Sequence, residues 1–224
     1  MKTPVVFCWS GGKDSALALF ELQTCPAFAK YEVVALLTTM TRDFNRVSMH
    51  GVRRELLHRQ AAELGLPIDE VWISQGAGNA EYETQMAEML AEYRQRGINA
   101  VAFGDIFLED LRVYREQNLA KVGMQALFPI WKRDTRELLE SFLAHEFRSI
   151  TCCIDTRKLG DSFVGRQIDR QFLNELPPDV DPCGENGEFH SFACAGPVFA
   201  REIRIRTGET VRRDSFLFCD LLPI

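Results

Sequence analysis

The sequence SGGKDS at residues 10–15 constrains the fold more than any other part of the chain. It follows the apolar run Val5–Trp9, which is typical of a buried strand, and it precedes an apolar, helix-like run over residues 16–22. A strand, a glycine turn and a helix N-terminus in this order direct several backbone N–H groups, and the positive end of a helix dipole, toward one point. The glycines allow close approach of a ligand, and Lys13 adds a full positive charge. The stretch therefore predicts a phosphate-binding loop.

This loop is not a Walker A motif, which requires the pattern GxxxxGK[ST]. Only two adjacent glycines precede Lys13, and Asp14 follows it. The complete stretch instead resembles the PP-loop of the ATP pyrophosphatases. That resemblance implies that the loop holds the β and γ phosphates of ATP, and that cleavage between the α and β phosphates releases pyrophosphate. The alternative without a binding role is an ordinary glycine-rich turn with a lysine that faces solvent.

Composition narrows the class of protein. The chain has 224 residues, of which 46% are hydrophobic and 26% charged, as in soluble globular proteins. A net charge of −6 argues against a general nucleic-acid-binding role, since proteins with that role are usually basic. No apolar run is long enough to span a bilayer, and the first strand begins by Val5, which leaves no room for a signal peptide. We therefore expect a cytoplasmic protein without membrane contacts.

The seven cysteines fit that location. Their number is odd and no CxxC pair occurs, so we expect small buried hydrophobic side chains rather than disulfides or a zinc site.

Strands and helices alternate over the first two thirds of the chain. Further strands are expected at Val33–Thr39, Ile68–Ser74 and Asn99–Gly104, with helical periodicity between them and a helix over Glu109–Val122. This alternation predicts an α/β fold with a mostly parallel sheet and helices on both faces. In such sheets ligands bind beyond the carboxyl ends of the strands. Three polar features lie at such ends: the 10–15 loop, the pair Thr38 and Thr39, and the pair Gly104 and Asp105.

One helical stripe needs its own interpretation. Apolar and aromatic residues recur at helical spacing from Tyr82 to Tyr93, in a helix that stops at Gly97. The members of this stripe are Tyr82, Met86, Met89, Leu90 and Tyr93. We interpret the stripe as core packing rather than as a set of cofactor contacts.

The last third of the chain has a different pattern. A fifth strand at Arg148–Ile154 could belong to the main sheet or to a separate lobe, and a helix is expected over Gly165–Leu176. Alternating runs at Val198–Arg206 and Val211–Cys219 predict a β-hairpin that turns at residues 207–209. We expect an ATP-binding domain at residues 1–125 and a smaller α+β substrate lobe at residues 126–224.

A second polar motif, CGENGEFHSF at residues 183–192, lies in this lobe. Glu185, Glu188 and His190 are closely spaced around two glycines, and such groups can position a substrate and move protons. From chemistry alone, a solvated turn that leads into a strand is an equal alternative. The neighbouring Phe189 and Phe192 indicate that the loop is anchored, which favours a functional role.

Taken together, the motifs resemble one family over nearly the whole chain. SGGKDS, GDI at residues 104–106, and CGENGEFHSF followed by GPVF are similar to the diphthine–ammonia ligases, a family of PP-loop ATP pyrophosphatases. The resemblance implies a HUP-like, Rossmann-like ATP domain with a C-terminal substrate lobe. It also implies ATP-driven amide formation, in which a carboxylate is adenylylated and ammonia then displaces AMP.

The second motif departs from the family pattern. The ligases resemble CGEGGEYETF there, whereas this chain has Asn186, Phe189, His190 and Ser191 at the variable positions. Residues 105–112 also lack the polar pattern of the ligases. These departures resemble the bacterial branch of the family, so the identity of the acceptor carboxylate stays open.

The resemblance and the residue chemistry together give each residue an expected role. The nucleotide is expected to contact Ser10, Gly11, Gly12, Lys13, Asp14, Ser15, Thr38, Thr39, Gly104 and Asp105. Lys13 neutralises the departing pyrophosphate, and Asp14 either helps to place Mg²⁺ or caps the helix. Thr38 and Thr39 border the adenine or the ribose, while Asp105 holds the ribose or the metal. Glu185, Glu188 and His190 face the acceptor, and Glu188 guides ammonia or takes its proton.

Several alternatives remain open at this stage. A PP-loop enzyme that modifies tRNA, a sulfate-activating type of reductase, and an ATP-binding protein without turnover all share such a loop. The arginines at positions 42, 46, 53, 54 and 59 form a basic cluster that is either a solvated helix face, an anion-binding rim or a tRNA contact. His50 beside them either touches phosphate or lies at the surface, where we also expect His58 and His145. The oligomeric state is open, and a homodimer is one option.

Overall fold

A computed structural model describes residues 2–76 and 78–224 of the chain. The main sheet has six strands, and its path runs β3-β2-β1-β5-β6, with β4 also paired to β2. All pairs in this sheet are parallel except β2 with the short β3. The strands are β1 (Thr3–Cys8), β2 (Tyr31–Thr41), β3 (Arg46–Val47), β4 (Ile68–Ile73), β5 (Ala100–Ala102) and β6 (Gln125–Leu127).

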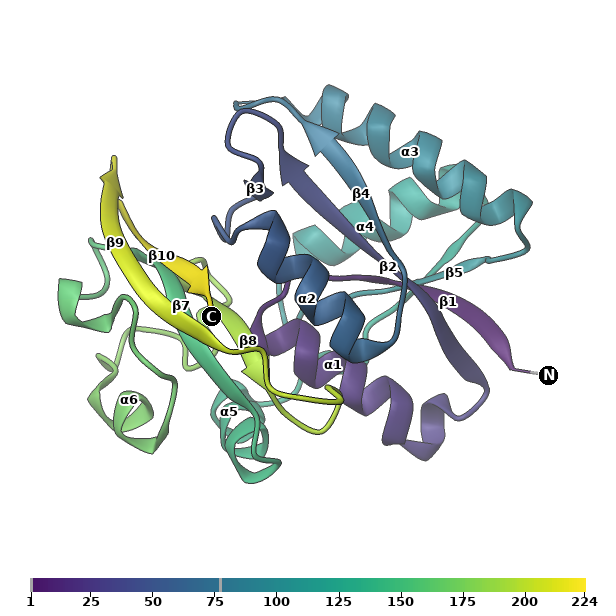
Figure 1. Cartoon of the computed structure of the whole chain (residues 1–224). Helices are drawn as coiled ribbons and strands as arrows, with labels where there is room; N and C mark the ends of the chain where they lie inside the picture. Colours follow the sequence, from purple (N-terminus) through teal and green to yellow (C-terminus); the bar gives the residue numbers. More distant parts are fainter. Residues whose placement is uncertain (1, 77) are drawn as a thin grey trace.

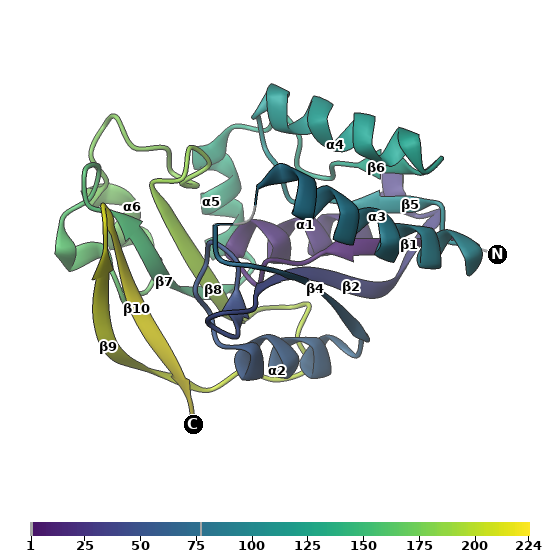
Figure 2. The same cartoon turned by 90° about the horizontal axis from the view of Figure 1, so that it is seen from above.

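Helices cover both faces of this sheet, as the alternating sequence pattern predicts (Figures 1 and 2). Side chains alternate along β1, so Val5 and Phe7 pack into the core that contains α1 and α2, whereas Val6 packs into the core that contains α3 and α4. The helices are α1 (Lys13–Thr24), α2 (Arg54–Leu64), α3 (Asn79–Gln95) and α4 (Glu109–Lys121), with a short 3-10 turn η1 (Pro26–Phe28) after α1.

A second sheet is antiparallel throughout and has the order β8-β7-β10-β9. It lies beside α1 and α2 in Figure 1. Phe172 and Phe192 of this part belong to the same core cluster as Phe7 of the main sheet, so the two sheets share one continuous core. The elements are α5 (Thr135–Ala144), β7 (Arg148–Asp155), η2 (Asp161–Phe163), α6 (Arg170–Glu175), β8 (Phe189–Ala195), β9 (Ile205–Arg213) and β10 (Phe216–Pro223).

The fold is therefore α/β with a mostly parallel, helix-covered sheet and an additional antiparallel sheet, as predicted. The fifth strand, β7, belongs to the second sheet, where it pairs with β8 and β10. No helix among the described residues is both long and apolar enough to cross a membrane.

Two local predictions are wrong. The C-terminal hairpin turns at Asp214-Ser215 rather than at residues 207–209, because Asp214 adopts the left-handed conformation (φ 52°) that tight hairpin turns require, while Thr207 is paired with Leu221 within the ladder. The helix expected over Gly165–Leu176 is confined to α6. Ile168 is extended and donates its N–H to the carbonyl of Ser149, and Asp169 then caps α6.

Candidate active site

A cavity of about 500 Å³ lies where the carboxyl ends of β1, β2 and β5 meet the 184–191 segment that leads into β8. Both polar motifs of the sequence therefore contribute to one cavity, although they are far apart in the chain. Of the residues expected at the site, those that line the cavity are Ser10, Gly12, Lys13, Asp14, Ser15, Thr38, Thr39, Gly104, Asp105, Glu185 and His190. Gly11 and Glu188 do not line it.

The 10–15 loop has the geometry of an anion-binding nest. Gly11 has a φ of 81°, which turns the chain sharply between β1 and α1. The Ser10 hydroxyl accepts the N–H of Gly12 at 3.2 Å and lies 2.9 Å from the Ser15 hydroxyl. Within residues 2–76 and 78–224, no hydrogen-bond acceptor pairs with the N–H groups of Gly11, Asp14 and Ser15. These donors at a helix N-terminus are suited to phosphate oxygens.

Gln60 of α2 holds the glycine turn from behind. This fully buried side chain donates its amide N–H to the carbonyls of Gly11 (2.9 Å) and Ala193 (2.7 Å), and its carbonyl accepts the indole N–H of Trp9 (2.9 Å). A buried polar side chain with this many bonds fixes the backbone that it contacts. Nothing in the sequence points to Gln60, because a lone glutamine on an amphipathic helix gives no signal of such a role.

Lys13 is almost completely buried at the start of α1, with 3% of its side chain exposed. Its ammonium donates to both carboxylate oxygens of Asp14, at 2.9 and 2.8 Å, and to the carbonyl of Cys183. Burial alone would lower the pKa of Lys13, but Asp14, with smaller effects of Cys183 and Glu185, outweighs burial and leaves the pKa raised. Lys13 is therefore always positively charged at the cavity wall, where its ammonium is already paired with the Asp14 carboxylate.

The segment around β8 also holds the loop in place. The Ser191 hydroxyl accepts the N–H of Lys13 at 3.1 Å, and the N–H of Ala193 donates to the carbonyl of Gly11 at 2.8 Å. The phosphate-binding loop is thus supported by both parts of the chain.

Acidic groups gather at the end of the cavity near β5. Glu185 accepts the N–H of Ile106 at 2.7 Å, and Asp105 forms an ion pair with Arg115 at 2.6 Å. Burial raises the pKa of Glu185 to about 7; the Ile106 N–H opposes this shift, and the negative charges of Asp14 and Asp105 add to it. Glu185 can consequently gain or lose a proton near neutral pH.

Glu188 has a different position from the one expected. It is buried within its own loop, where it accepts the N–H groups of Asp181 (3.1 Å) and Asn186 (3.0 Å) and the side-chain amide of Asn186 (3.1 Å). These bonds give Glu188 a clear role in shaping the 181–188 turn. A direct role with ammonia stays a prediction.

Part of the cavity wall is apolar. Thr38 is buried and donates its hydroxyl to the Trp9 carbonyl at 2.6 Å, which fixes β2 against the end of β1, while Thr39 lines the cavity. Apolar and aromatic side chains form this part of the wall: Leu37, Ile73, Tyr82, Met86 and Phe103. The Tyr82–Tyr93 stripe packs largely as predicted, since Leu90 and Tyr93 are core residues and Met86 and Met89 pack against the same core. Tyr82 and Met86 line the cavity as well.

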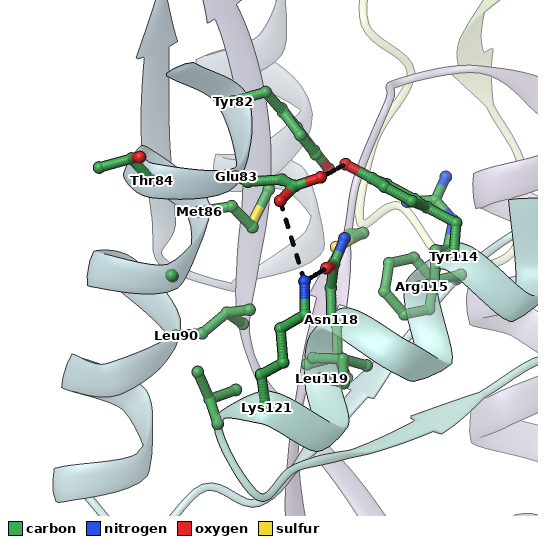
Figure 3. Close-up of a pocket in the computed structure, with 15 residues that line it drawn as sticks. Tyr82, Glu83, Thr84, Met86, Leu90, Tyr114, Arg115, Asn118, Leu119 and Lys121 are labelled. Carbon is green, nitrogen blue, oxygen red and sulfur yellow. Dashed lines mark hydrogen bonds and ion pairs between the residues drawn. The ribbon is translucent and has the colours of Figure 1, made fainter. Parts of the chain in front are cut away.

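A smaller side cavity of about 260 Å³ lies between α3 and α4. It shares these lining residues with the main one: Cys8, Tyr82, Met86, Phe103 and Arg115. Figure 3 shows the Glu83 side chain of α3 reaching toward Tyr114 and Lys121 of α4 across it. Its lining includes Met86, Leu90 and Leu119, so the apolar part of the main cavity continues beneath the two helices.

His50 lines the main cavity although the sequence left its position open. Its ring centre lies 4.6 Å from that of His190, and its Nδ1 lies 3.3 Å from the Ser191 carbonyl. His58 and His145 lie outside the cavity and contact Glu70 and Ser141. His50 lies in the turn that follows β2 and the short β3. This position after a long strand of the main sheet is the signal that could have revealed it.

The arginine cluster is mostly paired with neighbouring groups. Arg46 and Arg53 both bind the Asp220 carboxylate of β10, and so connect the two parts of the chain. Arg54 binds Glu70, and Arg59 binds Glu55 and the carbonyl of Ile224. These partners support the interpretation as a structural surface. The seven cysteines are all free thiols, five of them buried.

A parallel α/β sheet, a glycine loop with unpaired amides at its edge, and a buried lysine beside that loop define a nucleotide-phosphate-binding protein of the Rossmann-like class. Models of the diphthamide synthase N-terminal domain and C-terminal domain match residues 1–126 and 134–221, respectively. The chain therefore belongs to the diphthamide synthase family.

Relatives named diphthine–ammonia ligase are similar along almost the whole chain. The zebrafish (Danio rerio) protein is 25% identical over 228 residues, which cover 92% of this chain and 88% of the relative. The rat (Rattus norvegicus) protein is 29% identical over 227 residues, and the human protein is 22% identical over 226. For both, the match covers 90% of this chain and 82% of the relative.

Proposed function

We propose that this protein is an ATP-dependent amide-forming ligase. It adenylylates a carboxylate acceptor and releases pyrophosphate, and ammonia then displaces AMP to give the amide. The observation that carries the proposal is the single cavity in which a phosphate-binding loop with Lys13 faces the ionisable groups Glu185 and His190. Membership of the diphthamide synthase family and the names of the relatives support the same activity.

ATP fits the cavity in one orientation. The unpaired N–H groups of the 10–15 loop and Lys13 hold the β and γ phosphates, where Lys13 stabilises the charge that grows on the departing pyrophosphate. The apolar part of the wall near Ile73, Met86 and Phe103 takes the adenine, since a flat apolar ring gains most from that lining. Thr39 and Asp105 then border the ribose.

The donor set around the phosphate position also fits Mg²⁺. Asp14 supplies carboxylate oxygens at the cavity wall beside Lys13, and Asp105 lines the same cavity. In the described part of the chain, no three His, Cys, Asp or Glu side chains form a group that could hold a metal by themselves. Mg²⁺ normally binds through one or two carboxylates together with substrate phosphates, so this arrangement suits it. When bound, Mg²⁺ would supply charge neutralisation to the phosphates.

The loop at 184–191 forms the acceptor side of the cavity. Glu185, held by the N–H of Ile106, and His190 face the position of the α phosphate and are placed to hold the acceptor and to receive protons from ammonia. Glu188 supports these residues by fixing the turn. The acceptor is a small or protein-borne carboxylate whose identity we leave open.

We further propose that residues 1–125 form the ATP-binding domain and residues 126–224 the substrate lobe. The two family models, matched at 1–126 and 134–221, support this division. The seven free thiols suit a reducing compartment, in line with a cytoplasmic location.

Isotope exchange between pyrophosphate and ATP tests the proposal. Purified protein is mixed with MgATP, labelled pyrophosphate and a panel of carboxylic acids, without ammonium. The ligase is supported if exchange depends on one of the acids and if ammonium then yields an amide and AMP. Binding of ATP without exchange for any acid in a broad panel would favour a protein that binds ATP without turnover. A lack of ATP binding would overturn both functions.

A further inference from the structure

Two histidines form a close pair at the phosphate end of the cavity. His50 comes from the turn between β3 and α2, and His190 comes from β8, and their ring centres lie 4.6 Å apart. The His50 ring also lies against the phosphate-binding loop. A methyl group placed on Gly12 would sit 3.1 Å from the His50 Cε1 atom. His50 therefore lies directly against the loop that we assign to the triphosphate, with His190 beside it.

The hydrogen bond of His50 fixes its neutral tautomer. A carbonyl oxygen can only accept, so the contact of 3.3 Å between Nδ1 and the Ser191 carbonyl requires a proton on Nδ1. The other ring nitrogen, Nε2, is then left as a free acceptor. It can take up one additional proton without the loss of any existing bond.

The surroundings keep both rings neutral without a ligand. Burial lowers the pKa of His50 to about 3; His190 lowers it further, the Ser191 carbonyl opposes this shift, and Lys13 adds a smaller lowering. Burial, followed by Lys13, lowers the pKa of His190 to about 4. The groups that face the pair are thus the Lys13 ammonium from α1, the Ser191 carbonyl from β8, and each ring for the other.

A bound triphosphate favours the protonated form of the pair. It brings several negative charges next to the pair, whereas the one lysine at the loop is already bonded to both oxygens of Asp14. An added anion within a few ångströms favours the protonated form of an imidazole. Only one ring can accept the proton, because two imidazolium ions 4.6 Å apart would repel each other strongly.

We propose that His50 is an additional nucleotide-binding residue, and that the His50–His190 pair takes up one proton from solvent when the triphosphate binds. The proton adds to a free ring nitrogen and no other bond changes. The resulting imidazolium is a second cation at the phosphates, beside Lys13, and it returns its proton when pyrophosphate leaves. This inference rests on the proposed function, since it requires ATP at the 10–15 loop.

Nuclear magnetic resonance of labelled histidine rings tests the proposal directly. The chain has four histidines, so the spectrum contains four ring signals, and His58 and His145 are internal controls outside the cavity. At pH 7 and without nucleotide, the His50 and His190 signals should be those of neutral rings. Saturating ATP should move one of them, or their average, to the imidazolium position and leave His58 and His145 unchanged. Substitution of His50 by glutamine assigns the signals.

Calorimetry adds a second readout that needs no acceptor. In buffers with different ionisation heats, ATP binding to the wild type should take up about one proton more than binding to the double variant His50→Gln/His190→Gln, in which neither ring can accept it. His145→Gln should match the wild type, and the comparison cancels the titration of ATP itself. At pH 6.5, His50→Gln should bind ATP about tenfold more weakly than wild type. ATP that binds while both rings stay neutral would overturn this inference and leave the ligase intact. An absence of ATP binding to the folded wild type would overturn the proposed function as well.

Discussion

The hydroxyl of Ser191 accepts a hydrogen bond from the backbone N–H of Lys13 at 3.1 Å, across 178 positions in the sequence. This bond joins the two glycine-bearing motifs of the chain. It fixes the 10–15 loop relative to the 184–191 segment, so that both motifs line one cavity. In the proposed reaction, a phosphate on one side and an acceptor carboxylate on the other share that cavity. Enzymes that activate a carboxylate with ATP need this proximity, since the reacting atoms must approach to about 3–3.5 Å.

The lysine at the loop should be essential for nucleotide chemistry. We expect Lys13→Ala to reduce acid-dependent pyrophosphate exchange by about 100-fold or more, because no other lysine lines the cavity in the described part of the chain. Lys158→Ala, which removes a surface lysine paired only with Asp179, is the control. Exchange by Lys13→Ala within threefold of the control would show that this charge does not act on the phosphates.

Gln60 should matter for stability and for the shape of the loop. Gln60→Ala leaves the Trp9 indole without its partner, removes a donor from the Gly11 and Ala193 carbonyls, and opens a small cavity. We expect a loss of about 2–4 kcal/mol in the free energy of unfolding, measured with urea, together with weaker ATP binding. Gln95→Ala, at the exposed end of α3, should change stability by less than about 0.5 kcal/mol. Equal stability of the two variants would contradict the role assigned to Gln60.

Periodicity was sufficient to predict four strands of the main sheet, β1, β2, β4 and β5, but not the short β3 and β6. The runs Val5–Trp9 and Val33–Thr39 became the paired strands β1 and β2, because strands buried on both faces are apolar throughout. It failed where a tertiary contact competed with local preference. Ile168 has helical spacing to Phe172, but its N–H is bonded to Ser149 of β7, so the helix begins only after Asp169. The hairpin failed because Gly208 was taken as the turn, whereas the turn residue is Asp214.

The residues of the candidate site also fall into two groups, those that the sequence could place and those that it could not. Residues within a motif, such as Lys13 and Glu185, could be placed from the sequence because their neighbours carry the signal. Gln60 could not, since its hydrogen bonds join residues far away in the chain. For His50 the sequence left two positions open, because its contact with His190 cannot be read from the residues around it. Glu188 shows the limit of motif chemistry. A carboxylate in a polar loop can equally turn inward to hold that loop, and only its three hydrogen bonds reveal that it does.

Gly104 should be required for space rather than for flexibility. A Cβ at this position would lie 3.1 Å from the backbone nitrogen of Ser15 and 3.2 Å from the carbonyl carbon of Asp14. Backbone atoms cannot move aside as a flexible side chain can, so Gly104→Ala should push the strand end away from the loop and weaken ATP binding at least tenfold by calorimetry. Gly160→Ala is the matched control, because a Cβ there meets no atom within 4 Å. Unchanged ATP affinity in Gly104→Ala would mean that the loop does not bind the nucleotide in the arrangement proposed.

The raised pKa of Glu185 should appear in the pH dependence of stability. Its pKa is about 7 in the folded protein against an ordinary value of 4.5. Between these values the native state holds a proton that the unfolded chain has released, so this group lowers the free energy of unfolding as pH rises from about 4.5 to 7. We expect about 1–2 kcal/mol of this effect after allowance for solvent screening of a half-buried group. His50 and His190, whose pKa values are lowered, act in the opposite direction below pH 6.5, so the informative quantity is a difference between variants.

Urea unfolding at several pH values should show that wild type loses stability relative to Glu185→Gln between about pH 4.5 and 7. Glu140→Gln, on the exposed side of α5, should follow the wild type at every pH. Parallel curves for wild type and Glu185→Gln would mean that Glu185 ionises as an ordinary surface carboxylate, and would remove it as a proton acceptor at neutral pH.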